Sequence, residues 1–197
     1  MPKVTEQHRL ARQDEIIAAA LAAFRRKGFQ ATSMAEIIAE SGLSAGAIYG
    51  YFPSKADIIY AVATKIVGAR IVDLDNLARV EPMPEPAVML RTLLQGLIDN
   101  LGFPAILLQV WGEAVTDDRL RELCVEIFSR LRDAVTLYIV LWQQSAHGAS
   151  EQEAQRIAKD QVPLFISVVN GFVVQDSLVT GFDRDAYLAA TLPYLPK

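Results

Sequence analysis

The sequence has a single cysteine, Cys124, and only two histidines, His8 and His147, among its 197 residues. One cysteine excludes a disulfide within the chain, and so few thiol and imidazole groups leave almost no scope for a Cys/His metal site. We therefore predict no metal ion and no cofactor. Glycine (11 residues) and proline (9 residues) are not enriched, which argues against a chain dominated by disorder.

Long apolar runs and a secretory signal are missing too. The longest charge-free stretch in the C-terminal half, residues 161–175, is interrupted by Gln161, Pro163, Ser167 and Asn170, whereas a membrane-spanning helix needs about 20 mostly apolar residues. The first fifteen residues contain no apolar core of a signal peptide. We expect a cytoplasmic protein that makes no membrane contact. Because no nucleophile–base pair or metal-ligand set stands out, we do not expect an enzyme.

Charge is divided unevenly along the chain. The net charge is −4, yet residues 1–55 carry seven basic and five acidic side chains, and the remainder is strongly acidic. A mildly basic segment joined to an acidic one is typical of a small polyanion-binding surface on a larger scaffold.

Apolar residues recur at steps of three and four residues throughout, which predicts helices and no strands. Serine, threonine and aspartate stand where helices are expected to begin, and glycine where the first one ends. The pattern predicts about nine helices, at residues 9–27, 34–40, 44–52, 54–80, 87–100, 104–115, 117–146, 150–180 and 183–192.

Three short helices joined by tight turns, the second and third separated by residues 41–44, indicate a helix-turn-helix unit. The third helix is nearly bare: Ser44, Ala45 and Gly46 open it, and two tyrosines flank Gly50 near its end. Small residues there would let the backbone approach the phosphates of a DNA duplex closely.

These residues resemble the DNA-binding domain of the tetracycline-repressor (TetR) family. The resemblance rests on I-I-A-A-A-L-A-A-F-R-R-K-G-F-Q-A-T-S, residues 16–33, followed by I-A-E-S-G-L-S-A-G-A-I-Y-G-Y-F-P-S-K, residues 38–55. It implies an all-α homodimer in which an N-terminal three-helix head is joined by a long helix to a C-terminal helical body that binds a ligand and dimerises. We expect a DNA-binding domain at 1–55, a linking helix at 54–80 and a ligand-binding and dimerisation domain at 56–197.

The motif and the resemblance together predict the residues that contact DNA. Gly46 and Tyr49 match recognition-helix positions of the family, and Lys55 matches a lysine that contacts phosphate; Gly50 departs from the larger polar residue that the family usually has. The predicted DNA-binding residues are Thr32, Ser33, Ser44, Ala45, Gly46, Tyr49, Tyr51 and Lys55.

The body offers two further sets of candidates. Aromatic residues and one amide among apolar runs suit either an ordinary core or the lining of a ligand cavity, which the resemblance implies. These candidate ligand-binding residues are Phe103, Trp111, Phe128, Tyr138, Trp142 and Asn170. The segment 166–179 carries one charge and is apolar on nearly all sides, which favours a self-association surface. The candidate interface residues are Val168, Phe172, Leu178, Tyr187 and Leu188.

The sequence thus predicts a ligand-responsive transcriptional regulator, and more specifically a repressor that a small effector releases from a palindromic operator in double-stranded DNA. Aromatic and aliphatic side chains suggest an apolar or aromatic effector, and tryptophan and tyrosine faces also suit a cation. The alternative is a DNA-binding regulator that has no small-molecule ligand.

Overall fold

A computed structural model describes residues 6–101 and 103–195, and all of their regular structure is helical. The all-α fold predicted from the sequence is confirmed. The elements in chain order are α1 (Glu6–Lys27), α2 (Met34–Ser41), α3 (Ala45–Tyr51), α4 (Lys55–Ala78), α5 (Pro86–Leu101), α6 (Ala105–Ala114), α7 (Asp118–His147), α8 (Glu151–Leu178), α9 (Arg184–Thr191) and the 3₁₀ turn η1 (Leu192–Tyr194).

Short polar side chains set where most of these helices begin. Six helices follow a serine or aspartate whose side-chain oxygen accepts a hydrogen bond from the backbone N–H three residues later, which satisfies a donor that the first turn leaves free. These capping residues are Ser33, Ser44, Ser54, Asp117, Ser150 and Asp183. Three helices end at a glycine in the left-handed region, α1 at Gly28 (φ 86°), α2 at Gly42 (φ 67°) and α7 at Gly148 (φ 65°).

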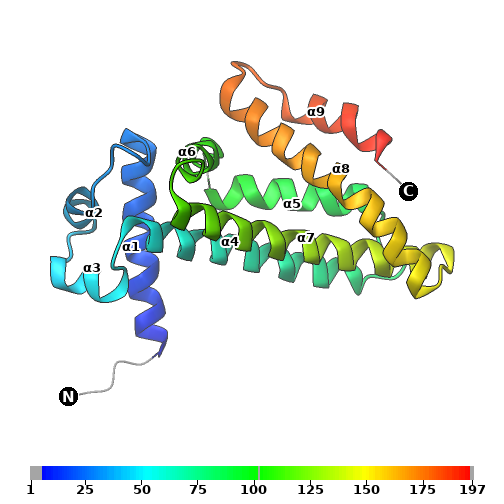
Figure 1. Cartoon of the computed structure of the whole chain (residues 1–197), viewed down its shortest axis with the longest axis horizontal. Helices are drawn as coiled ribbons and strands as arrows, with labels where there is room; N and C mark the ends of the chain where they lie inside the picture. The colour runs from blue at the N-terminus through cyan, green and yellow to red at the C-terminus, as the bar shows by residue number, and fades with distance from the viewer. Residues whose placement is uncertain (1–5, 102, 196–197) are drawn as a thin grey trace.

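Figure 1 shows two parts of unequal size. Helices α1–α3 form a compact head at one end, and α4 leaves it to run beside α7 along the body. Helices α5 and α8 also pack on α7, and α9 packs on α8 at the far side of the body from α4. We call α1–α3 the head and α5–α9 the body.

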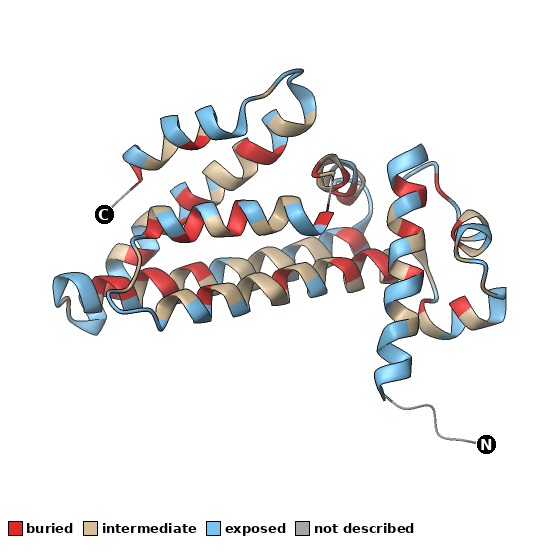
Figure 2. Cartoon of the chain, turned by 180° about the vertical axis from the view of Figure 1, so that it is seen from behind, coloured by how far each residue is buried: buried red, intermediate tan, exposed pale blue. Residues whose placement is uncertain are grey.

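Two clusters of buried apolar side chains hold these parts together (Figure 2). The first joins Phe24, Ile37 and Ile48 of the head to Ile58 on α4 and Val110 on α6. The second fills the body and includes residues of α4, α5, α7, α8 and α9. Because the first cluster continues from the head into α4 and α6, the end of the body nearest the head is packed directly against it. The boundary between residues 55 and 56 stays a prediction.

Helix α8 differs from expectation in one respect. By length and composition alone it could cross a membrane, and one third of its apolar window is buried in the protein. The core helix of a water-soluble protein meets the same criteria. In this fold Ala158, Val162, Phe165 and Phe172 on α8 are fully buried in the body cluster, so at least one face of the helix packs against protein.

Candidate nucleic-acid interface and body cavity

The helix-turn-helix unit is built by local hydrogen bonds. Ser33 and Glu36 form a complete capping box at the start of α2, since each side chain bonds the backbone N–H of the other. Gly42 turns the chain after α2, and the Ser44 hydroxyl accepts a hydrogen bond from the Ala47 N–H to begin α3. The short helix is therefore fixed at its start by a side chain that the sequence itself supplies.

One side of α3 anchors it to the head. Ile48 is fully buried, and Phe52 directly after the helix is buried too, where both pack near Phe24 and Ile37. Tyr51 is half-buried against the same cluster. This anchoring leaves Tyr51 less accessible than its predicted role in DNA contact suggests.

The other side of α3 faces solvent. Ser44, Ala45, Gly46 and Gly50 are exposed, and Tyr49 keeps 49% of its surface exposed. A Cβ atom added at Gly46 or Gly50 would meet no described atom within 4 Å. The predicted contact residues of α3 thus lie together on a bare surface, and packing within the head gives no reason for either glycine.

The structure contradicts the prediction that Thr32 contacts DNA. Only 1% of its surface is exposed, and its hydroxyl donates to the carbonyl of Gly28 at 2.7 Å. A side chain held in this way cannot reach a phosphate, so the prediction for Thr32 is wrong. Ser33, the next residue, is exposed and caps α2.

Lys55 makes contacts that the sequence does not predict. Its ammonium donates to the carbonyl oxygens of Phe29, Gln30 and Thr32 at 2.7, 3.2 and 2.9 Å. It also lies 4.5 Å from the centre of the Phe29 ring, a cation–π contact. Lys55 thereby joins the start of α4 to the loop between α1 and α2. Its predicted phosphate contact would compete with three existing hydrogen bonds.

The other basic residues of the head, within residues 6–55, are paired with neighbours in the chain. Four of them form ion pairs on exposed surfaces, which contribute little to stability and exchange partners at small cost. The pairs are Arg9–Glu6, Arg12–Glu15, Arg26–Glu40 and Lys27–Glu36. Lys27, together with the Ser33 N–H and hydroxyl, lowers the pKa of Glu36 to about 2.

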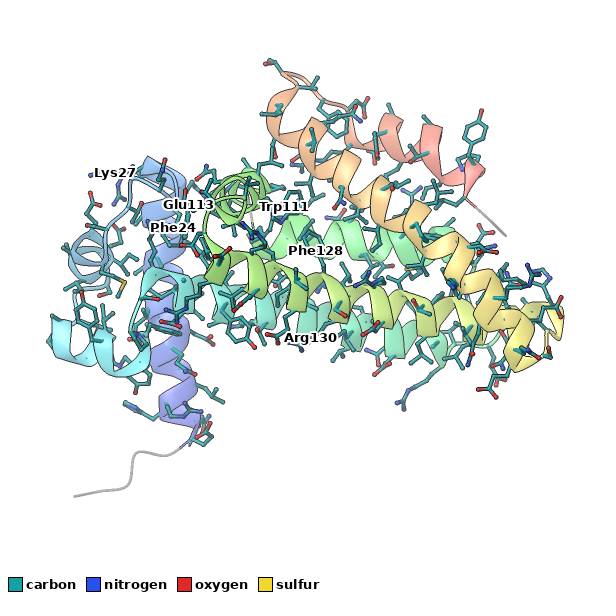
Figure 3. All side chains as sticks on the ribbon, viewed as in Figure 1. Phe24, Lys27, Trp111, Glu113, Phe128 and Arg130 are labelled. Atoms are coloured by element: carbon teal, nitrogen blue, oxygen red, sulfur yellow. The ribbon has the colours of Figure 1, made fainter. Side chains whose placement is uncertain are left out.

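A cavity of about 140 Å³ lies among α4, α5, α6, α7 and α8, and Leu21 on α1 is the residue of the head that lines it. Its wall is almost wholly aliphatic and aromatic. Trp111 on α6 and Phe128 on α7 both line it, with their ring centres 5.7 Å apart. Figure 3 labels both residues where the two helices lie side by side. Asn170 on α8 lines the cavity as well.

The structure places the other three predicted ligand-binding residues elsewhere. Phe103 packs under the guanidinium of Arg25, 4.9 Å from its ring centre. Tyr138 and Trp142 are buried in the body cluster, and the Tyr138 hydroxyl donates to the Pro84 carbonyl at 2.8 Å. Burial raises the pKa of Tyr138 to about 12. These three aromatics make packing contacts and are not among the residues that line this cavity, and their contact with a ligand stays a prediction.

The sequence reasoning missed Arg70, which also lines the cavity. A signal was present, because Arg70 falls between Val67 and Leu74 on the buried stripe of α4, where an apolar residue is expected. Cys124 lines the same cavity, and burial raises the pKa of its thiol, so it is a poor nucleophile there.

Some of the residues predicted at the dimer interface are buried within the chain, and others are exposed. Phe172 and Leu188 are buried within the chain, and the Tyr187 hydroxyl donates to the Val168 carbonyl at 2.9 Å. These four residues hold α9 on α8 within one chain. Because Phe172 and Leu188 are not accessible to a partner, the prediction that they lie in the dimer interface is wrong. Leu178 is 71% exposed. The sequence reasoning missed two apolar residues on the same face of α8 that are exposed as well, Leu164 and Val174.

The fold and the exposed α3 define an all-helical protein with an N-terminal helix-turn-helix head. Residues 16–62 match the model of the family described as bacterial regulatory proteins, tetR family. The helix-turn-helix head therefore belongs to the TetR family of regulatory domains.

Two curated relatives are similar in sequence. One is the uncharacterized HTH-type transcriptional regulator YfiR of Bacillus subtilis, 39% identical over 77 residues, which are 39% of this chain and 38% of the relative. The other is the HTH-type transcriptional regulator TtgR of Pseudomonas putida, 30% identical over 124 residues, which are 62% of this chain and 52% of the relative. The matched part thus spans about half the length of these relatives or less.

Solved structures share the fold over nearly the whole chain. A putative TetR-family regulator from Syntrophomonas wolfei has a TM-score of 0.77 at 17% identity, covering 94% of this chain and 93% of that one. A putative regulator from Saccharomonospora viridis, in complex with choline, has a TM-score of 0.64 at 20% identity, covering 92% and 94%. The repressor FadR of Thermus thermophilus, in complex with lauroyl-CoA, has a TM-score of 0.59 at 20% identity, covering 92% and 91%.

Proposed function

We propose that this protein is a dimeric, ligand-responsive transcriptional regulator that represses its target genes. The observation that carries the proposal is the exposed face of α3, which is anchored on one side by Ile48 and bare on the other at Gly46 and Gly50. Family membership supports DNA as the partner of this face. A cytoplasmic location follows from the proposal, since bacterial chromosomal DNA is the target.

DNA binding would place α3 in the major groove. Tyr49 is the large exposed side chain of this helix, so its hydroxyl and ring are the natural contacts for phosphate, sugar or a thymine methyl group. The exposed Arg9, Arg12, Arg26 and Lys27 are held by weak ion pairs, and they can exchange a carboxylate for a phosphate. Release of counterions would then make binding salt-dependent.

A dimer is needed to read a palindrome. Two recognition helices must lie about 34–36 Å apart to enter successive major grooves on one side of the duplex. The exposed apolar face of α8, marked by Leu164, Val174 and Leu178, is the surface that we assign to self-association. Its spacing of ten and four residues keeps these side chains on one side of the helix.

The ligand site in this proposal is the cavity among α4, α5, α6, α7 and α8. A ligand shifts the protein between two states only if its affinities for those states differ. Helices α4 and α6, which line the cavity, also contact the head, so such a shift can change DNA binding. Helix α6 lines it with Ile106, Val110 and Trp111. On the same helix, the Gln109 side-chain oxygen accepts a hydrogen bond from the Phe29 N–H at 2.6 Å.

Two helices therefore connect the cavity with the head. Helix α6 reaches the loop between α1 and α2 through Gln109, and α4 reaches the same loop through Lys55. A ligand that shifts α6 or α4 would change the position of the head, and with it the separation of the two copies of α3. The presence of the cavity favours this account over a regulator without a ligand.

A gel-shift assay with the DNA upstream of the protein's own gene tests the proposal. We expect a specific, salt-sensitive complex at nanomolar dimer concentration. Tyr49→Ala should weaken it by at least about tenfold, an effect equivalent to the loss of about 1.4 kcal/mol of binding free energy. Tyr194→Ala is the matched control, since Tyr194 is 83% exposed at the end of the body. Equal binding by wild type and Tyr49→Ala would refute the proposed contact surface.

A further inference from the structure

The inference concerns the chemical class of the ligand, and it rests on the proposed function. Among the described residues that line the cavity, Arg70 is the only charged one. Its side chain is 11% exposed, so the cation borders an apolar cavity and is mostly shielded from water. Such a charge requires an anionic partner, because an apolar environment does not stabilise it.

The protein itself satisfies only part of the guanidinium. Asp73, one turn further along α4, accepts from Nη2 at 3.0 Å. The Nε atom is buried, and none of the described residues provides a hydrogen-bond partner for it. A guanidinium presents five N–H donors in a planar fork, so donors remain available after the ion pair with Asp73 is made.

Gly96 on α5 gives independent support that the guanidinium has a specific place. A Cβ atom at this position would lie 1.0 Å from Arg70 Nη1 and 2.1 Å from Arg70 Cζ. Any other residue at position 96 would displace the guanidinium. The glycine stands in the middle of a helix, where alanine is intrinsically better, and the space it leaves is occupied by Arg70.

We propose that the cavity binds a small carboxylic acid, with its carboxylate on Arg70 and its apolar part against Trp111 and Phe128. Arginine pairs with carboxylates through two parallel hydrogen bonds, and the ion pair with Asp73 leaves other N–H groups of the guanidinium unused. The volume of about 140 Å³ is close to that of an engineered cavity of about 150 Å³ that holds benzene. It therefore suits an acid with a single ring or a short chain. The effector expected from the aromatic residues alone included cations, and the position of Arg70 disfavours them.

Isothermal titration calorimetry of the full chain tests this with a matched pair of probes. The probes are 3-phenylpropionate and 3-phenylpropionamide, which have nearly the same shape and differ in charge. We expect the wild type to bind the carboxylate at least about tenfold more tightly than the amide. Arg70→Gln should abolish this preference while leaving the affinity for the amide within about threefold.

Two further variants test the position of the guanidinium and control for general charge. Gly96→Ala keeps the positive charge and displaces the guanidinium, so it should lose the preference for the carboxylate as well. Arg79→Gln removes an exposed positive charge at the end of the same helix, and it should keep the preference. Equal binding of both probes by the wild type, or an unchanged preference in Arg70→Gln and Gly96→Ala, would overturn the inference. Binding of neither probe at about 1 mM would overturn it too.

A gel-shift assay on the same preparations separates this inference from the proposed function. A specific DNA complex formed by a wild-type protein that shows no preference for the carboxylate would refute the ligand class alone. A protein that prefers the carboxylate through Arg70 and forms no specific DNA complex would support the ligand site and refute the regulator.

Discussion

At the scale of single residues, the ammonium group of Lys55 illustrates how one side chain joins two elements. The loop between α1 and α2 brings three backbone carbonyls close together, and the Lys55 ammonium donates a hydrogen bond to each of them. The ring of Phe29 lies under the same ammonium and packs edge-on against Phe24, with ring centres 5.3 Å apart. Lys55 therefore stabilises the loop, the start of α4 and, through Phe29, the head core.

Replacing Lys55 tests this structural role. Lys55→Met keeps much of the side-chain length and removes the hydrogen bonds to three carbonyls, so we expect a loss of about 1–3 kcal/mol of unfolding free energy. Thermal melting followed by circular dichroism measures the loss.

Lys65→Met serves as the control for Lys55→Met, because Lys65 is exposed and, among the described residues, forms an ion pair with Asp14 alone, which is exposed too. It should change stability by less than about 1 kcal/mol. Equal melting temperatures for the two variants would show that Lys55 does not hold the loop.

Sequence reasoning handles local contacts at this scale better than distant ones. The capping roles of Ser33, Ser44 and Ser54 are visible in the sequence because the acceptor and donor lie three residues apart. The hydrogen-bond partners of Thr32 and Lys55 are not visible in the sequence. From the sequence both residues are predicted to contact DNA, because nothing in it shows that folding brings the backbone carbonyls of 28–32 next to them.

At the scale of elements, α6 has two functions on its two sides. Trp111 and Val110 face the cavity, whereas Gln109 contacts the head. The contact is tight, because a Cβ atom at Gly28 would lie only 3.2 Å from the Gln109 side-chain oxygen. In the proposed mechanism, a ligand that displaces α6 would therefore also move the end of α1.

Gln109→Ala should loosen this connection. The Phe29 N–H loses its acceptor, which costs about 0.5–1.5 kcal/mol locally. We expect faster amide hydrogen exchange in peptides that cover residues 28–33, measured by mass spectrometry.

Gln95→Ala is the matched control, since the Gln95 side chain donates a hydrogen bond to Asp99 within its own helix α5. Its exchange in residues 28–33 should equal that of the wild type. Unchanged exchange in Gln109→Ala would contradict a mechanical connection through α6.

The predicted elements agree with the observed helices because periodicity marks their apolar stripes and side-chain caps mark the start of six of them. Which body aromatics line the cavity and which lie in the core could not be predicted in the same way. Trp111, Tyr138 and Trp142 all stand on apolar stripes, and only the packing of α5, α7 and α8 decides which stripe faces a cavity. Residue type alone does not distinguish a core aromatic from a cavity aromatic.

At the scale of the whole molecule, the proposed dimer depends on α8. One face of this helix is buried by its own chain at Phe165, Phe172 and Val173. The exposed face still carries Leu178, Val174 and Leu164. The segment looked apolar on nearly all sides in the sequence because it serves both the body core and an exposed apolar surface, and periodicity cannot separate the two.

Leu178→Glu places a charge on this exposed surface. We expect dimerisation to weaken by at least about tenfold, because an unpaired charge at an apolar interface is strongly unfavourable. Sedimentation velocity over a range of concentrations measures the change.

Val72→Glu makes the same substitution on α4, which lies along the opposite side of the body from α9 (Figure 1). Val72 is 55% exposed, and the dimer should be unaffected. Loss of the dimer in this variant, with retention in Leu178→Glu, would move the interface from α8 to α4.

The most direct test of the central claim uses glycine 46. Gly46→Leu has open space in the free protein, and leucine favours helix over glycine by up to about 1 kcal/mol, so the variant should melt no lower than the wild type. Gly112→Leu on α6 makes the same change at another exposed glycine with open space around it. In a fluorescence anisotropy titration with operator DNA, we predict that Gly46→Leu loses at least about tenfold in affinity while Gly112→Leu binds like the wild type. Wild-type affinity in a folded Gly46→Leu protein would contradict the claim that the bare face of α3 enters the groove.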